Sequence, residues 1–316
     1  MDWLDHYEEE LRLVFQESKH IISGFPEPLN SQGLTYLELF NVFNTDSHKN
    51  YICYLLPFWL QKGYALPPDD IRKMSMGNVF FMLYFFIQDD LMDSNESSAS
   101  ERLPLANLLY VEFLNIYRSL FPHTSSFWSS FNRYISQWAD SVSNENTGDY
   151  FLNDRVKIAY KASPLKLSST AALLLSGNDS LIDQSEAMID QVLLTLQLLD
   201  DYEDWEEDLK NGSYNNCLLS LTRSQLPSHA EKFTPSEVND FLYTKNGLDT
   251  YVEVALNNHS KLVTYNLEAP HLLTFHHMLI SNLQQISAAI QAKKEILQNG
   301  SLNHWLSKNI IFPNIL

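Results

Sequence analysis

Apolar residues recur along most of the chain at the three- and four-residue spacing that is typical of amphipathic helices. The longest stretches with this spacing cover residues 70–93, 185–210 and 271–298. Alternating apolar and polar residues around tight turns, which would predict β-hairpins, are lacking. Two Asn-Gly pairs each follow a long helical stretch, so we expect Gly212 and Gly300 to end helices.

Proline and glycine interrupt the helical pattern at several corners, where we expect one helix to end before another begins. These corners are residues 24–28 and 67–68, Pro104, Pro122, Pro227, Pro235 and Pro270. No repeat of fixed period is present. Residues 94–100 predict a short loop and not a domain boundary, because no longer linker rich in Pro, Gly or Ser divides the chain. We therefore predict one all-α domain over residues 1–316.

Composition narrows the class of protein. Nine glycines in 316 residues fall below the roughly 7% of an average protein, which fits long helices. The hydrophobic content of 45% and the aromatic content of 13% exclude a disordered chain. With 21 basic and 39 acidic residues the net charge is −18, which excludes nucleic acids and anionic membrane surfaces as partners.

The two cysteines and the N-terminal residues indicate in which cellular compartment the protein is located. Cys53 and Cys217 lie far apart without metal-type neighbours, which excludes a disulfide scaffold and favours a reducing, cytoplasmic location. The first residues are acidic and amphipathic, unlike a signal peptide. The longest apolar run, residues 79–87, is shorter than the about 20 residues needed to cross a bilayer. We predict a buried helix there and no membrane-spanning segment.

The first candidate site lies where residues 88–93 read Gln-Asp-Asp-Leu-Met-Asp. Asp89 and Asp93 are four apart, so they share a helix face and can hold one cation. Phe81, Met82 and Phe85 precede them on that face and predict an apolar pocket beneath a metal-binding mouth. Carboxylates at a helix C-terminus oppose the helix dipole and therefore require a compensating positive charge. The alternative is a buried helix with a solvated acidic end.

The second candidate site is an acidic run in which seven of the nine residues 200–208 are Asp or Glu. Asp200, Asp204 and Asp208 step by four and form a ladder of carboxylates on one helix face. A solvated acidic face is the alternative interpretation. The apolar stretch 192–199 before the run, and the specific tail after it, favour a functional site.

Two clusters of carboxylate oxygens favour a hard cation such as Mg²⁺. Proteins seldom cage Mg²⁺ alone; it usually joins carboxylates to phosphate oxygens of a substrate. A phosphate ligand in a chain this acidic also needs a metal, because bare carboxylates would repel it. The two clusters therefore predict a diphosphate held by Mg²⁺ above an apolar cavity.

At this point the chain resembles the class I isoprenoid synthase superfamily. Asp89-Asp90-Leu-Met-Asp93 is similar to the first motif, DDxxD, and residues 200–208 occupy the place of the second. The superfamily comprises terpene synthases and trans-isoprenyl diphosphate synthases, with squalene and phytoene synthases more distant. The resemblance implies a single helical bundle around a central apolar cavity. It also implies three Mg²⁺ ions per active site, which bind a substrate diphosphate whose departure leaves an allylic carbocation.

The second motif resembles the terpene synthase form (N/D)DxxSxxxE, which is followed by a glycine and an asparagine at intervals of four. With Asp200 at its first position, Asp208 takes the place of the glutamate, and Gly212 and Asn216 match. Asp204 puts a carboxylate where the family has a hydroxyl. The metal ligands that the resemblance implies are Asp89, Asp93, Asp200, Asp204 and Asp208.

The resemblance also implies cations that hold the diphosphate. Arg155 lies 45 residues before Asp200, where terpene synthases carry a diphosphate-sensing arginine, and Lys157 and Lys161 follow it. Residues 299–305 resemble the segment before an Arg-Tyr dyad, but the dyad is missing and Lys308 stands in its place. A plain surface charge is the alternative for each of these residues.

We therefore expect a Mg²⁺-dependent terpene synthase, a lyase that ionises a prenyl diphosphate of fifteen to twenty-five carbons and cyclises or quenches the cation. Asp89 and Arg155 would be catalytic. Phe81, Met82, Tyr84 and Phe85 would line the cavity, and the three aromatic residues among them would offer ring faces to the cation. Since dimers are common in the superfamily, a homodimer is a candidate assembly.

Two alternatives remain. A trans-isoprenyl diphosphate synthase fits Asp200-Asp201-Tyr-Glu-Asp204, but Arg102 stands alone where elongating enzymes carry paired arginines after the first motif. Such an enzyme would need isopentenyl diphosphate as a second substrate. A non-catalytic homologue that kept the fold would fit the missing Arg-Tyr dyad, and it would fail to bind Mg²⁺ and a diphosphate analogue together.

Overall fold

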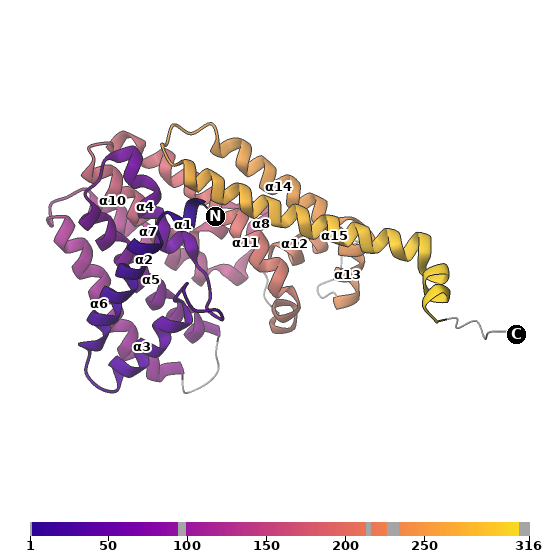
Figure 1. Cartoon of the computed structure of the whole chain (residues 1–316), viewed down its shortest axis with the longest axis horizontal. Helices are drawn as coiled ribbons and strands as arrows, with labels where there is room; N and C mark the ends of the chain where they lie inside the picture. The colour runs from indigo at the N-terminus through magenta and orange to yellow at the C-terminus, as the bar shows by residue number, and fades with distance from the viewer. Residues whose placement is uncertain (1, 94–98, 213–215, 226–233, 310–316) are drawn as a thin grey trace, which may run out of the picture. The chain divides into compact units, whose positions relative to one another are not determined.

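The computed structural model describes the backbone of all residues except 1, 94–98, 213–215, 226–233 and 310–316. The side chains of 2–3, 93, 99–100, 146 and 297–309 also lie outside the description. Every regular element in the described part of the chain is a helix, and none is a strand, which confirms the all-α prediction (Figure 1). Among the described helices, none combines the length and the apolar character needed to cross a bilayer.

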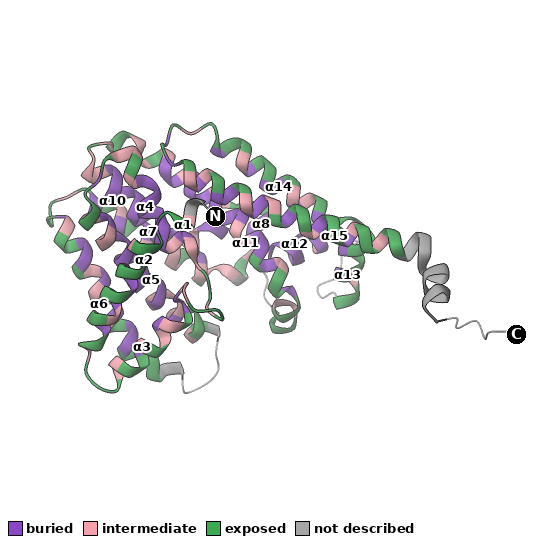
Figure 2. Ribbon diagram, in the orientation of Figure 1, coloured by how far each residue is buried: buried purple, intermediate pink, exposed green. Residues whose placement is uncertain are grey.

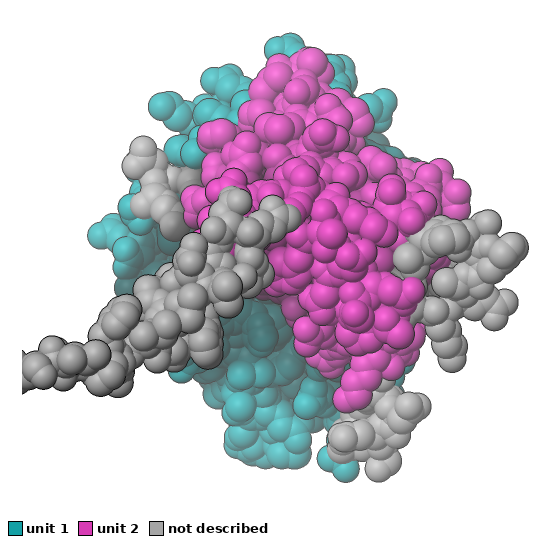
Figure 3. All heavy atoms as spheres, turned by 90° about the vertical axis from the view of Figure 1, so that its right-hand side faces the viewer, with its two compact units in different colours: residues 1–140, 160–189, 265–275 teal, residues 141–159, 190–264, 276–316 magenta. Residues whose placement is uncertain are grey.

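The chain divides into two compact units, each assembled from separate segments. Unit 1 contains residues 1–140, 160–189 and 265–275, and unit 2 contains residues 141–159, 190–264 and 276–316 (Figure 3). Three long helices, α7, α11 and α15, contribute residues to both units. The single domain over residues 1–316 with one central cavity stays a prediction, and each unit is described by itself below.

Unit 1 is built mainly from the N-terminal helices. Its α-helices are α1 (Asp2–Asp5), α2 (Glu8–Ser23), α3 (Leu29–Leu39), α4 (Tyr51–Tyr64), α5 (Pro68–Asp93), α6 (Leu103–Leu120), most of α7 (Phe127–Ser143) and α10 (Lys166–Leu175). Short 3₁₀ helices are η1 (Ala99–Arg102), η3 (Ser163–Leu165) and η4 (Asp179–Leu181).

Unit 2 contains the remaining elements. These are η2 (Glu145–Thr147), α8 (Tyr150–Asn153), α9 (Val156–Tyr160) except its last residue, most of α11 (Ile182–Asn211), α12 (Cys217–Gln225), α13 (Pro235–Tyr243), α14 (Gly247–Leu262) and most of α15 (Pro270–Asn309).

The predicted corners agree with the observed helix ends. The break at 24–28 separates α2 from α3, and the break at 67–68 separates α4 from α5. Pro104 lies in the first turn of α6 and Pro122 follows its end, while Pro235 and Pro270 begin α13 and α15. The positions of Pro104, Pro235 and Pro270 suit proline, because the first turn of a helix needs no backbone N–H donor. Pro227 lies outside the described residues.

The two predicted glycine stops have different outcomes. Gly212 follows the last residue of α11 and has a φ of +78°, a left-handed conformation that glycine adopts without strain. The prediction for Gly300 is wrong, because α15 continues through it to Asn309. One glycine in a helix costs only about 1 kcal/mol relative to alanine, so a long helix can continue through it.

The core of unit 1 lies around α5, which packs against α2, α4, α6 and α10. Figure 2 shows buried residues along α4 and α10, where nearly every position from 52 to 60 and from 166 to 173 is buried. Large side chains such as Trp59, Phe80 and Phe113 are at most 1% exposed. Each stabilises the fold by roughly 1.5–3 kcal/mol or more relative to an exposed position.

A buried polar cluster joins α11, α14 and α15 in unit 2. The His276 side chain is fully buried; its Nε2 lies 2.8 Å from Thr195 Oγ1 and its Nδ1 lies 3.0 Å from Nδ1 of His259. The Thr195 hydroxyl donates to the Gln191 carbonyl and accepts from the Asn258 amide. These bonds satisfy polar groups that would otherwise be costly to bury.

Candidate functional site

The first acidic motif lies at the C-terminal end of α5, as predicted. Asp89 and Asp90 are exposed, whereas the side chain of Asp93 lies outside the described residues. Arg102 Nη1 lies 2.7 Å from Asp90 Oδ2. This ion pair supplies the compensating positive charge that carboxylates at a helix C-terminus require. Asp90 is thus engaged with Arg102, and cation binding by Asp89 and Asp93 stays a prediction.

A tyrosine from α3 completes this end of unit 1. The guanidinium of Arg102 lies 5.9 Å from the centre of the Tyr36 ring. Burial raises the pKa of Tyr36, the charges of Asp90 and Asp89 raise it further, and Arg102 opposes them. The hydroxyl therefore stays protonated and is available as a hydrogen-bond donor. Nothing in the sequence pattern pointed to Tyr36, because its neighbours are far away along the chain.

The predicted cavity residues precede the first motif on α5. Phe81 and Met82 are buried, and Tyr84 and Phe85 are half-buried. Met82 Sδ accepts a hydrogen bond from the Tyr54 hydroxyl at 3.3 Å.

The three aromatic residues pack on rings from α6 and α7. The ring-centre distances are 5.9 Å for Phe81–Phe113, 4.7 Å for Tyr84–Tyr110 and 4.5 Å for Phe85–Trp138. All four predicted residues therefore belong to an aromatic region of unit 1, and their role as a substrate wall stays a prediction.

The second acidic motif lies in the last part of α11 and has two different faces. Asp201 is 5% exposed and accepts hydrogen bonds from Gln197 Nε2 at 2.7 Å and from the Cys217 backbone N–H at 2.6 Å. Asp200 and Asp204 are exposed and Asp208 is half-buried. Asp201 thus anchors the start of α12, while the predicted ladder of Asp200, Asp204 and Asp208 remains on another face of the helix.

The carboxylates of this ladder influence one another. The pKa of Asp200 is raised above its ordinary value by desolvation, and the charges of Asp204, Glu203 and Asp208 raise it further. A hydrogen bond from Gln197 opposes these effects. Charges that destabilise one another in this way are relieved by a cation.

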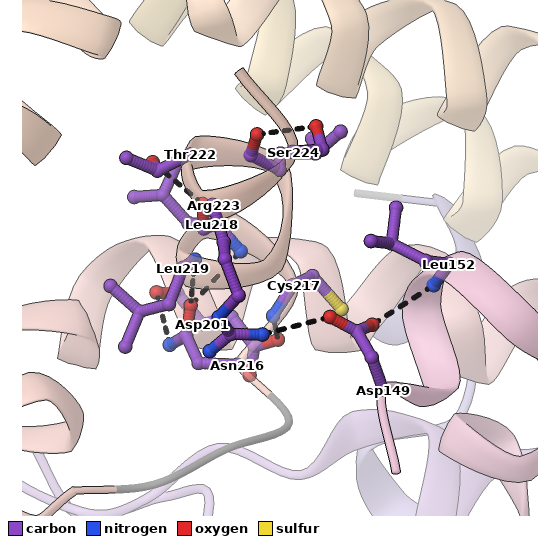
Figure 4. A network of polar contacts seen from close by, with 11 residues as sticks. Asp149, Leu152, Asp201, Asn216, Cys217, Leu218, Leu219, Thr222, Arg223 and Ser224 are labelled. Atoms are coloured by element: carbon purple, nitrogen blue, oxygen red, sulfur yellow. Dashed lines mark hydrogen bonds and ion pairs between the residues drawn. The ribbon is translucent and has the colours of Figure 1, made fainter. Parts of the chain in front are cut away.

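Asn216 connects the end of the motif to the beginning of α12. Its Nδ2 donates to Asp208 Oδ2 at 2.7 Å and to the Asp201 carbonyl at 2.9 Å. Its Oδ1 accepts from the backbone N–H groups of Leu218 and Leu219, as an N-cap residue does (Figure 4). One amide therefore orients a ladder carboxylate and starts the next helix.

An ion pair supports α12 from the other side. Arg223 Nη1 lies 2.8 Å from Asp149 Oδ2, and Asp149 also accepts from the Leu152 backbone N–H at the start of α8 (Figure 4). Asp149 is 7% exposed, so this pair is partly desolvated and bonds more strongly than a surface pair. The last turn of α12 is consequently held by the N-cap residue of α8, whereas its first residue is held by Asp201 of α11.

Arg155 lies between α8 and α9 in unit 2. Its Nε donates to the Phe151 carbonyl at 2.9 Å, and its guanidinium lies 4.4 Å from the centre of the Phe151 ring. It lines a pocket together with Asp190 and Leu194, which precede Asp200 by six to ten positions, or about 9–15 Å of helix. No hydrogen bond or ion pair between described side chains joins Arg155 to the carboxylate ladder.

The predicted lysines are placed differently. Lys157 Nζ lies 5.5 Å from the centre of the Tyr150 ring in unit 2. Lys161 is half-buried and belongs to unit 1. Lys308 lies in α15, and its side chain is outside the described residues. Diphosphate binding by these lysines and by Arg155 stays a prediction.

The donor set fits Mg²⁺ in its chemistry. Among side chains that the structure describes, no three His, Cys, Asp or Glu residues converge on a position for one metal ion. Mg²⁺ commonly takes one or two carboxylates and fills its other positions with water and phosphate oxygens. Asp89 and Asp93 belong to unit 1, and Asp200, Asp204 and Asp208 belong to unit 2.

Comparison of the sequence with models of known protein families gives no match, and comparison with curated proteins gives no significant match. The functional assignment therefore rests on the two motifs and on the local geometry around them.

Proposed function

We propose that this chain is a class I terpene synthase that ionises an allylic prenyl diphosphate and releases diphosphate. The observation that carries the proposal is that the carboxylates of the second motif lie on two different faces of α11. Asp201 is buried and holds α12, whereas Asp200, Asp204 and Asp208 are left on another face, and Asn216 returns to orient Asp208. A merely solvated acidic run would need neither a buried anchor nor an asparagine bonded to its last carboxylate.

The proposed ligands are Asp89 and Asp93 of the first motif and Asp200, Asp204 and Asp208 of the second. Bound Mg²⁺ would neutralise the diphosphate and make it a better leaving group. Asn216 keeps the Asp208 carboxylate in one orientation, which lowers the entropy that cation binding must remove. Arg155 is proposed to add donors to the departing oxygens, since its Nε bonds to the Phe151 carbonyl and its two Nη groups make no hydrogen bond or ion pair with the described residues.

The aromatic residues before the first motif would serve the organic part of the substrate. Phe85 and Tyr84 are half-buried at the end of α5 that carries Asp89. Aromatic faces attract a cation by roughly 0.5–2 kcal/mol each. Their burial against Trp138 and Tyr110 also fixes their orientation. We propose that these two residues lie closest to the reacting chain.

The decisive experiment measures diphosphate release from prenyl diphosphates of ten to twenty-five carbons, with Mg²⁺ or with EDTA, and identifies products by mass spectrometry. Asp89→Ala and Asp208→Asn should each lower Mg²⁺-dependent release at least a hundredfold. Glu206→Gln is the matched control, because Glu206 is exposed in the same acidic run but off the ladder face. Full activity in both Asp89→Ala and Asp208→Asn would refute the proposal.

A trans-isoprenyl diphosphate synthase is the second candidate, and one observation favours it. Asp204 places a full carboxylate beside Asp200, and its charge is the largest electrostatic contribution to the raised pKa of Asp200. Two carboxylates four residues apart on one helix face are the arrangement that a DDxxD motif needs. If products form only after isopentenyl diphosphate is added, and they are longer diphosphates, this second candidate replaces the first.

A further inference from the structure

Unit 2 contains a pocket of about 640 Å³ between α11, α14 and the α8–α9 segment. Most residues that line it are polar, including Arg155, Gln191, Asn258, Lys261 and Thr264. Pockets of this size take small molecules. A polar lining does not suit a prenyl tail, whose burial depends on apolar contact.

Two cations face this pocket without an ion pair. Arg155 and Lys261 are both exposed, and no carboxylate of the described residues pairs with either. Asp190 also lines the pocket, but it is only 6% exposed and has a contact of its own. Counting these three residues, the pocket has a formal charge of +1 within a chain of net charge −18. Such a local excess of positive charge attracts an anion.

The same pocket offers acceptors to a ligand. Gln191 lines the pocket, and its Oε1 is closed to solvent and has no hydrogen-bond partner among the described residues. A ligand hydroxyl reaches this oxygen once the flexible Gln191 side chain turns toward the pocket. The hydroxyls of Ser260 and Thr264 donate to the carbonyls of Leu256 and Lys261, so their free lone pairs also accept. A buried acceptor without a partner costs about 1–3 kcal/mol, and a ligand hydroxyl would recover that energy.

We propose that this pocket binds a small phosphate ester that carries free hydroxyl groups, which is the chemistry shared by sugar phosphates and nucleotides. The phosphate lies against Arg155 and Lys261, and a hydroxyl donates to Gln191. Binding needs no Mg²⁺, because the pocket is itself positive. Arg155 also has a role in the proposed synthase reaction, whereas Lys261 and Gln191 belong to this pocket alone, so variants of these two residues test the inference separately from the synthase activity.

The test is calorimetry on the full chain in EDTA, with ribose 5-phosphate and ADP as probes and inorganic phosphate as the reference. Both esters should bind saturably and several times more tightly than phosphate. Lys261→Gln should weaken ribose 5-phosphate binding about tenfold, the loss expected for one charge-assisted hydrogen bond. Lys293→Gln, which removes an exposed lysine of α15, is the matched control and should change nothing.

Two further variants separate the parts of the proposal. Gln191→Met should remove the advantage of ribose 5-phosphate over phosphate while phosphate affinity is kept. Asp208→Asn should leave EDTA-resistant binding intact even if it abolishes Mg²⁺-dependent turnover, so the two proposals fail independently. Hydrogen exchange should show new protection at 254–264 and none at 200–208.

Three results would overturn the inference. The first is no saturable binding of either ester at millimolar concentration in EDTA. The second is an equal loss of affinity in Lys261→Gln and Lys293→Gln. The third is equal affinity for ribose 5-phosphate and inorganic phosphate, which would eliminate the role of the hydroxyl groups.

Discussion

Lowering the pH from about 7 to about 5 is expected to destabilise the packing around His276. The bonds at Thr195 fix which nitrogen of His276 carries a proton. The Gln191 carbonyl can only accept, so it takes the Thr195 hydroxyl proton, and the Asn258 amide fills one lone pair. The remaining lone pair accepts from His276 Nε2–H. Nδ1 of neutral His276 is then unprotonated and accepts from Nδ1–H of His259.

A second proton on His276 would have no acceptor in this network. Burial lowers the pKa of His276 to about 3, and the nearby His259 and His277 lower it as well. The unfolded chain binds this proton near pH 6.5. Stability from neutral His276 is therefore present above pH 6.5 and is lost as the pH falls toward 3. Between pH 7 and pH 5 the loss is about 2 kcal/mol, from 1.36 kcal/mol per pH unit below 6.5.

The assay is urea unfolding at both pH values for the unmodified chain, His276→Gln and His123→Gln. The free energy of unfolding of the unmodified chain should fall about 2 kcal/mol more between pH 7 and pH 5 than that of His276→Gln. His123 is exposed, so its variant should follow the unmodified chain. An equal pH-induced loss in His276→Gln would refute the reasoning, because the loss would then come from other groups.

Three further changes test the site and its surroundings. Asn216→Ala removes an N-cap and the bond to Asp208, so urea unfolding should show a loss of about 1–2 kcal/mol; an unchanged midpoint would contradict the role given to its amide. Arg102→Gln breaks an exposed pair with Asp90, so the same measurement should change by less than about 1 kcal/mol; a larger loss would show that the pair is structural. Gly212→Ala forces a side chain to the left-handed φ of +78°, and thermal unfolding should report a loss of about 1–2 kcal/mol; equal stability would mean that this turn rearranges.

The helices were predictable because long periodic stretches outweigh local signals. The stretch 70–93 became α5 with a start only two residues earlier, since Pro68 fits the first turn of a helix. The prediction at Gly300 was wrong because one glycine destabilises a helix only slightly, and the rest of α15 outweighs that cost. Nothing in the sequence indicated the two units, because they are defined by contacts between distant segments and no linker of distinct composition separates them.

The candidate site was predictable where it depends on helix periodicity. The spacing of four placed Asp200, Asp204 and Asp208 on one helix face, but it gave no indication that Asp201 would be the buried carboxylate of the motif. Tyr36 and Lys261 were not predictable, because their places near Asp90 and in the Arg155 pocket follow from tertiary packing. No spacing rule connects residues so far apart in the sequence.

The segmental build of unit 1 constrains how the chain folds during synthesis. Phe275 packs on Trp59 with ring centres 5.3 Å apart, and His271 packs on Tyr7 at 5.7 Å. Both partners from 265–275 are made only after residues 190–264 of unit 2. Domains usually fold from the N-terminus as they emerge, but unit 1 must wait for the ribosome to pass residue 275. A chain truncated before residue 275 therefore lacks part of unit 1 and part of unit 2, so neither unit can be isolated by such a truncation.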